Sequence, residues 1–434
     1  MPTHSSTTAA AHKPGEGRML AAFISVTLLF FAWGFVTSLN DPLIAAVKRI
    51  FSLNDTEGSL TQFAFFIAYG VVSIPAGRLV ARSGYGLAIV YGLLAMLLGC
   101  LIMPLASRLN GYWIVLVALF VIASGMTVLQ VAANPLSAAL GPPALSHFRL
   151  TLSQFCNSIG TVLGPYFGSK VLLTGGVFAG GAVVVNAGVR AESLQKINSA
   201  YLLLAAFIAL LVIFAWANRA RFSAAAPQST AQLSAFSAMR SRWALFGAAA
   251  IFLYVGAEVS IGSLMTNFLS QANIFGVTPE RAGKLTGEFY WGGAAAGRLV
   301  GSLLLTRVAS TRILAIAAAC ATILCLIVSQ TSGELAGTVA LSIGFFNSIM
   351  FPVIFTMTLE RSSAPTAATS GLLCMAIIGG ALLPLVYGRV ADLASRNAAY
   401  WVPLAAYALI VLFAVRAARA PILARDGTPA RAPH

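Results

Sequence analysis

Charged residues are scarce in this chain of 434 residues: only 9% are Asp, Glu, Lys or Arg, whereas 59% are hydrophobic. A soluble globular domain carries about 25% charged residues, so this composition excludes a soluble globular protein. A bilayer core needs roughly 20 apolar residues per helical span, and the apolar runs here have that length. The sequence therefore predicts an all-α polytopic membrane protein.

Cysteine and histidine are also rare. The five cysteines lie inside apolar runs without metal-ligand spacing, and the four histidines lie in tails or at a loop edge. Because no nucleophile or ligand cluster can be assembled from them, we expect no metal, no cofactor and no enzymatic activity. The net charge of +15 comes from Lys and Arg scattered singly through short loops. Nucleic acid needs a continuous basic face, so it is not an expected partner.

Twelve apolar stretches predict twelve membrane-spanning helices in two sets of six. Their predicted bounds are 19–46, 58–81, 86–106, 112–135, 149–173, 199–217, 243–269, 283–306, 311–330, 335–359, 366–390 and 398–416. The expected domains are a tail (1–18), a six-helix bundle (19–218), a Ser- and Ala-rich linker (219–242), a second six-helix bundle (243–416) and a second tail (417–434).

Most Lys and Arg fall on the side that holds both termini and the linker. The protein is expected in the inner membrane of the cell. Positive residues accumulate on the cytoplasmic side of membrane proteins, so both termini are expected to face the cytoplasm. The polar start lacks a small-residue cleavage site and is interpreted as a tail. Residues 177–198 are expected to form an external surface loop.

Three carboxylates fall within the predicted spans: Asp41, Glu258 and Glu288. A charge at a helix centre costs about 2.5–3.5 kcal/mol, so each carboxylate needs a cavity, a partner or a proton. Asp41 is either a boundary residue in headgroup water or a group that takes a proton outside and releases it inside. Glu258 is either a cation-coupling residue or part of a structural hydrogen bond, and Glu288 can pair with Arg281 or Lys284.

Neutral polar residues recur at helical spacing inside the spans. Gln130 shares a face with Asn134, and Gln154 shares one with Asn157. Gln62 and Tyr69, seven residues apart, share a third. With aromatics such as Trp33, Tyr290 and Trp291, these side chains suit a neutral polyhydroxylated ligand, because amides both donate to and accept from hydroxyls. Each amide alone can instead serve only to hold helices together.

The two sets of six helices around a linker resemble the major facilitator superfamily, whose halves rock about a central site. The stretch GRLVARSGYG (77–86) resembles the superfamily's cytoplasmic loop motif, with Ala81 where an acidic residue is usual. WGFVTSLNDPL, LQVAANPL, HFRLTLSQFCNSIGT, YVGAEVSIGSLMTNFL, YWGGAAAGRLVG, GFFNSIMFPVIF and SGLLCMAIIGGALLPLVYG resemble the fucose, glucose and galactose symporters. The resemblance covers nearly the whole chain.

The resemblance implies a sugar substrate, a cation gradient and one central site. Fucose transporters use an aspartate matching Asp41 and a glutamate where this chain has Gln130, and Asn157 matches a residue of their sugar site. Since glutamine cannot titrate, and LQVAANP is closer to the glucose/galactose branch, we expect a hexose other than fucose, imported with H⁺ or Na⁺ by a monomer. The expected cation-coupling residues are Asp41 and Glu258. The expected sugar-binding residues are Asn157, Gln154, Asn134, Gln130, Gln62, Tyr69, Asn267, Asn347, Trp33 and Trp291.

Other functions stay open at this point. An amino sugar such as N-acetylglucosamine, or fucose itself, fits the same pattern, and Gln130 allows a facilitator without coupling. SIGTVLGPYFGS (158–169) is similar to the glycine-proline pattern of drug/proton antiporters. Physically that pattern gives a kink and a close-packing surface, which serve either direction of coupling.

Overall fold

Helices make up almost all of the computed structural model, which describes residues 16–38, 55–109, 111–172, 187–224, 226 and 236–423. The described α-helices of the first half are α1 (Glu16–Ser38), α3 (Asp55–Arg108), α4 (Tyr112–Ala139), α5 (Ser146–Leu172) and α6 (Ala187–Ala224). Those of the second half are α7 (Arg242–Leu269), α8 (Pro279–Leu285), α9 (Gly292–Leu304), α10 (Ser310–Gln330), α11 (Gly333–Asn347), α12 (Met350–Arg361), α13 (Thr366–Met375), α14 (Gly379–Leu393) and α15 (Trp401–Arg419).

Within the described residues, nine helical segments are long and apolar enough to cross a membrane. One of them covers Phe63–Ala106 within α3 and contains two of the predicted spans. Gly84 separates these spans with a φ of +80°, a left-handed conformation that favours glycine because it has no Cβ. In the part of the chain that the structure describes, counting α3 twice and adding α5 and the run α8–α9 gives twelve helical segments, the number that the sequence predicts.

Short irregular turns interrupt three crossings of the second half. The π-helix η4 (Thr286–Trp291) joins α8 to α9, and the 3₁₀ turn η5 (Ala376–Ile378) joins α13 to α14. The residues between α11 and α12 break a third span. Such breaks are tolerated in a membrane where neighbouring protein covers the backbone or where the backbone lines a water-filled cavity.

Helix α6 corrects the prediction for the segment before it. It begins at Ala187 and not near residue 199, so the expected loop across 177–198 is wrong for residues 187–198. This stretch is rich in good helix formers, and its apolar residues Leu194 and Ile197 are buried. The prediction failed because the polar residues in this stretch interrupt the run of apolar residues by which the membrane-spanning helices were recognised.

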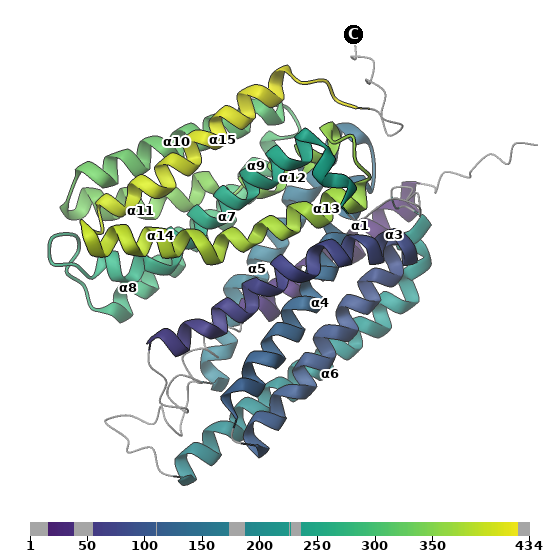
Figure 1. Ribbon diagram of the computed structural model, residues 1–434, viewed down its shortest axis with the longest axis horizontal. Helices are drawn as coiled ribbons and strands as arrows, with labels where there is room; N and C mark the ends of the chain where they lie inside the picture. The colour runs from purple at the N-terminus through teal and green to yellow at the C-terminus, as the bar shows by residue number, and fades with distance from the viewer. Residues whose placement is uncertain are drawn as a thin grey trace, which may run out of the picture.

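Each half buries a separate set of helix faces and exposes apolar side chains outward. On α1, Ala22, Val26 and Leu29 are buried, while Leu20 and Ile24 are each 60% exposed on another face. In a helix that crosses a membrane, an exposed apolar stripe of this kind faces lipid. Figure 1 shows the two halves approaching each other where α1 begins and α15 ends, and spreading apart toward α8.

The glycine-proline pattern of α5 forms a packing surface. A Cβ on Gly160 would collide with the backbone of Phe31, and a Cβ on Gly164 would collide with Ser38, both on α1. This contact explains the pattern as a close approach of two helices within the first half.

Candidate functional site

An ion pair lies inside the second half. Oε1 of Glu258 on α7 is 3.4 Å from a terminal nitrogen of Arg298 on α9, and these side chains are only 13% and 14% exposed. Tyr254, one turn before Glu258, donates its hydroxyl to the same oxygen at 2.7 Å. The charge of this buried carboxylate is compensated by a cation and a hydroxyl. Glu258 therefore has the partners that a carboxylate inside a membrane span needs.

Arg298 connects this ion pair to the first half of the molecule. Its Nε donates to the carbonyl of Ser348 at 3.1 Å, and another guanidinium nitrogen donates to the hydroxyl of Ser158 on α5. Ser158 in turn donates to the carbonyl of Gln154. Because α9 and α5 belong to different halves, one side chain touches both a second-half carboxylate and the polar face of α5.

Asn347 is the centre of a second polar cluster in the same half. Its Nδ2 donates to the hydroxyls of Tyr290 and Tyr407, each at 3.1 Å, and Tyr290 donates to the backbone carbonyl of Glu258 at 2.9 Å. The Oδ1 of Asn347 is buried and has no hydrogen-bond partner among the described residues. Buried polar atoms are normally paired, so an acceptor without a partner is unusual at this position.

The π-helix η4 explains how Tyr290 and Trp291 reach this interior. Tyr290 is fully buried and packs edge-on against Trp291, with ring centroids 4.9 Å apart. Trp291 also lies against Gly262 of α7. An extra residue in a helical turn shifts the following side chains around the axis, and such turns often occur at functional sites.

Four uncharged polar residues of the first half form two hydrogen-bonded pairs. Nε2 of Gln130 donates to the hydroxyl of Tyr69 at 2.8 Å, joining α4 to α3. Nε2 of Gln154 lies 3.4 Å from Oδ1 of Asn134, joining α5 to α4. Apart from the nearby thiol of Cys374, Nδ2 of Asn134 has no partner among the described residues. These two pairs form one layer of amides and a phenol.

Asn157 and Trp33 lie where α1 meets α5. Nδ2 of Asn157 donates to the carbonyl of Phe30 at 3.0 Å, so this amide is partly used to hold the helices together. Trp33 is buried and tilted against Phe30, with ring centroids 4.1 Å apart. Phe30 therefore contacts both residues and helps to fix their positions.

Three predicted residues are not brought into these clusters. Asp41 and the side chain of Gln62 lie outside the described part of the chain. Asn267 is exposed near the end of α7, where its backbone carbonyl accepts from Arg396 at 2.7 Å. Their roles stay predictions. Glu288 is exposed and pairs with Lys284 at 3.8 Å, one of the two partners expected for it.

Sequence reasoning did not single out Arg298, although a signal was present. Arg298 lies inside the eighth predicted span, 283–306, and is flanked by apolar residues and glycine. An intramembrane carboxylate needs a partner, so a search of the other spans for a cationic residue to pair with Glu258 would have identified Arg298. Among the described residues, no group of three or more His, Cys, Asp and Glu side chains could hold a metal ion.

The two halves also touch near the chain termini, through polar side chains. His147 at the start of α5 contacts Thr356 and lies 3.2 Å from the carboxylate of Glu360 at the end of α12. Arg361 also pairs with Glu360, and Leu423 beyond α15 donates to its carbonyl. We refer to His147, Thr356 and Glu360 as the end contact. No role could be predicted for His147, because its partner Glu360 lies more than 200 residues away in the chain.

Small residues complete this closed end. A Cβ on Gly77 of α3 would collide with the carbonyl of Ala367, and Gly371 of α13 packs on Ser73 in the same way. Ser370 donates to the carbonyl of Val131 on α4 at 2.8 Å. These contacts bring α13 against α3 and α4 without space between the backbones, so the halves are sealed on the side of the termini.

Two helical bundles that meet at one end, with polar side chains buried inside and between them, are typical of a membrane transporter whose halves move against each other. Residues 22–373 match the model of the Major Facilitator Superfamily, and the chain belongs to that family. It is 42% identical over 393 residues to a glucose/galactose transporter of Brucella abortus, covering 90% of this chain and 93% of that protein. It is 31% identical over 418 residues to the L-fucose-proton symporter of Escherichia coli, covering 92% and 94%.

A solved structure has the same arrangement of helices. The transporter FucP, described as being in the outward conformation, superposes with a TM-score of 0.82 at 27% identity, covering 92% of this chain and 99% of that one. The similarity extends through both halves, so the fold is that of the major facilitator superfamily, as the sequence predicts.

Proposed function

We propose that this protein imports a hexose of the glucose/galactose type by secondary active transport, coupled to H⁺ or to Na⁺. The observation that carries the proposal is the pairing of a neutral layer of amides and a phenol in the first half with a buried ion pair in the second. The glucose/galactose transporter that is 42% identical supports the substrate class, and the L-fucose-proton symporter supports cation coupling.

The sugar would bind between the halves, where uncharged donors and acceptors are available. Gln130 with Tyr69, and Gln154 with Asn134, offer amide and phenol groups on one side. On the other side, Oδ1 of Asn347 can accept from a sugar hydroxyl. Trp33 and Trp291 would cover the C–H face of the ring. Asn157, Asn267 and Gln62 complete the proposed set.

The coupling step would act on the Glu258–Arg298 pair. A proton on Glu258 would neutralise the carboxylate and weaken its attraction to Arg298. Because Arg298 also donates to Ser158, its release changes a contact between the halves as well as a charge within one of them. Asp41 would supply the proton from the external side. Either carboxylate, with neighbouring hydroxyl and carbonyl oxygens, could instead hold Na⁺.

The protein would lie in the inner membrane of the cell, with its sealed end facing the cytoplasm. The excess of Lys and Arg on the side of the termini supports that orientation. The contacts at that end then correspond to an outward-facing state, in keeping with the similar structure in the outward conformation. Alternating access requires the end contact to open while the opposite side closes. A single chain with a complete pathway would work as a monomer.

The test is transport by the full-length protein in proteoliposomes. Labelled glucose, galactose, N-acetylglucosamine and fucose are offered under an inward pH gradient and then under a sodium gradient, with Asp41→Asn alongside. We expect glucose or galactose to accumulate under one gradient and the variant to lose accumulation. Accumulation of the amino sugar or fucose alone would overturn the substrate class.

One observation favours a second candidate, a facilitator that equilibrates sugar without a gradient. Gln130 is neutral and its amide is bonded to Tyr69, so helix α4 offers no titratable group at that position. Uptake that stops at equal concentrations inside and outside under both gradients would favour the facilitator and would contradict the coupling role of Glu258.

A further inference from the structure

A hollow of about 530 Å³ lies on the outer surface of α3, away from the proposed sugar site. Seven residues of α3 and one residue before η3 (Ser237–Arg240) line it: Gly70, Val71, Ile74, Pro75, Arg78, Leu79, Arg82 and Phe236. We refer to this hollow as the α3 groove. Val71 and Phe236 are 58% and 59% exposed, so the groove opens to the surroundings of the protein. We propose that it binds an anionic phospholipid of the leaflet on the side of the termini.

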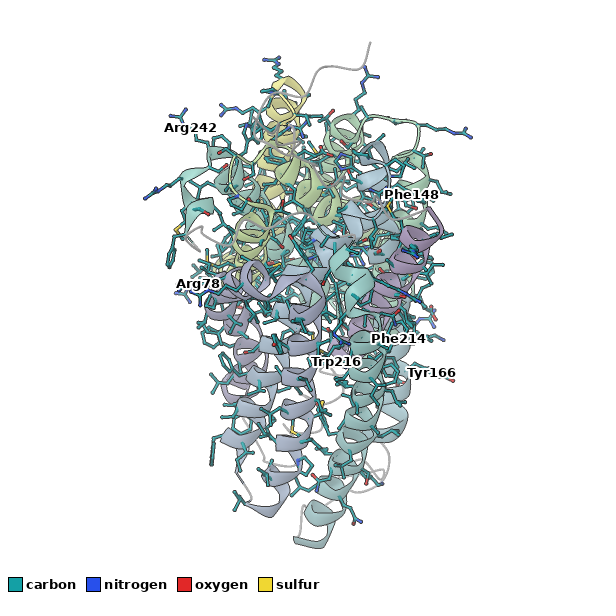
Figure 2. All side chains as sticks on the ribbon, turned by 90° about the vertical axis from the view of Figure 1, so that its right-hand side faces the viewer. Arg78, Phe148, Tyr166, Phe214, Trp216 and Arg242 are labelled. Carbon is teal, nitrogen blue, oxygen red and sulfur yellow. The ribbon has the colours of Figure 1, made fainter. Side chains whose placement is uncertain are left out.

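The charge of the groove is positive and uncompensated. Arg78 and Arg82 lie one helical turn apart, both exposed, and neither forms a salt bridge or a hydrogen bond with a described residue. The sequence has no Asp or Glu between Glu57 and Glu192, and none in the linker 219–242. Figure 2 shows Arg78 projecting from the edge of the molecule on the same side as Arg242. Two neighbouring guanidinium groups suit the phosphate of a lipid headgroup.

The remaining surface of the groove is apolar and has the length of one leaflet. From Arg82 to Gly70 the helix rises about 18 Å, at 1.5 Å per residue. Half of a bilayer core about 30 Å thick is about 15 Å. The segment lies within the membrane-spanning part of α3, and Val71, Ile74 and Pro75 provide walls without polar groups.

A ligand for this groove therefore needs an anionic group at one end and a long apolar chain at the other. A phospholipid has both, with its phosphate at Arg78 and Arg82 and an acyl chain along Ile74 and Val71. Inorganic phosphate or a soluble phosphate ester would leave the apolar wall without a partner. A zwitterionic lipid would place its own cation near the two arginines, so the groove discriminates by headgroup charge.

Native mass spectrometry of the delipidated full-length protein tests this proposal with phosphatidylglycerol and phosphatidylcholine of identical acyl chains. We expect wild-type protein to retain phosphatidylglycerol at concentrations at least tenfold lower than phosphatidylcholine. The variant Arg78→Gln/Arg82→Gln should lose that preference. The matched control Arg240→Gln/Arg242→Gln removes the same charge from exposed residues outside the groove lining and should keep it. Equal behaviour of the two variants, or no preference in the wild type, would overturn the proposal.

Two further measurements keep the test decisive. Inorganic phosphate in excess should not displace bound phosphatidylglycerol, and displacement would indicate a soluble-anion site and overturn the lipid assignment. A photoactivatable phosphatidylglycerol should label the peptide that contains residues 70–82 in wild-type protein. Labelling only elsewhere would contradict the proposal without reliance on any variant.

Discussion

The two halves of this transporter fold line their meeting place with different chemistry. The first half contributes amides and a phenol, in the pairs Gln130–Tyr69 and Gln154–Asn134. The second half contributes a buried ion pair, Glu258–Arg298, and the Asn347 cluster. Neutral groups suit a neutral sugar, whereas a charge pair responds to a cation. The difference suggests that the neutral layer acts mainly in sugar recognition and the ion pair in coupling, and that the hydrogen bond from Arg298 to Ser158 joins the two.

The largest effect is expected from breaking the ion pair. Glu258→Gln leaves Arg298 buried without its counter-charge, which should cost about 3 kcal/mol of stability and abolish accumulation of sugar. Thermal unfolding and proteoliposome uptake measure the two effects. The double variant Glu258→Gln/Arg298→Gln should recover most of the stability without recovering accumulation. Accumulation by either variant would contradict a coupling role for this pair.

A smaller effect is expected from the neutral layer. Gln130→Ala removes a hydrogen-bonding amide, worth about 1.4 kcal/mol, so sugar affinity should fall about tenfold while accumulation persists at high sugar concentration. Concentration-dependent uptake gives the KM. Among the described residues, the side-chain amide of Gln271 bonds to the carbonyl of Phe268. Gln271→Ala therefore serves as the control and should leave the KM unchanged. Loss of accumulation at saturating sugar would contradict the proposed division of roles between the neutral layer and the ion pair.

The end contact should have a still smaller influence. Glu360→Gln weakens the link to His147 by about 1 kcal/mol, so the open population at that end should rise about fivefold. Cys374 on α13 is buried where α13 meets α4, so its alkylation rate reports the opening. Cys325, buried inside the second half, should react at its original rate. Unchanged alkylation of Cys374 would show that the backbone contacts alone hold the end closed.

The smallest effect is expected at Glu288. Its partner Lys284 lies 3.8 Å away, and the two side chains are 54% and 74% exposed. Exposed pairs of this kind contribute less than about 0.5 kcal/mol, so Glu288→Gln should change uptake by less than twofold. A larger loss of uptake would place Glu288 in the coupling pathway.

The fold was accessible from sequence because its cause is local. A run of about 20 apolar residues must form a helix to cross a bilayer, so each span could be predicted without knowledge of its neighbours. The start of α6 at Ala187 was missed because amphipathic residues extend that helix beyond its apolar part. The turn at Gly84 divides α3 where the sequence places a loop.

The site was only partly accessible, because partners come from distant segments. Helical spacing placed Gln130 and Asn134 on one face, but it did not pair Gln130 with Tyr69. It marked Glu258 as an unusual carboxylate without naming Arg298, forty residues further on. His147 and Glu360 are paired only by the packing of α5 on α12. Sequence identifies polar residues that need partners, and the tertiary structure decides which partners they have.

The central claim is most directly tested by comparing exchange with accumulation in the same proteoliposomes. Counterflow of labelled sugar needs recognition and movement of the halves, whereas accumulation also needs coupling. For Glu258→Gln/Arg298→Gln, we predict counterflow with little change and no accumulation. For Gln130→Ala, both should fall together at low sugar concentration and recover together at high concentration. Equal loss of counterflow and accumulation in the charge-pair variant at all concentrations would contradict the claim that the neutral layer serves recognition and the ion pair serves coupling.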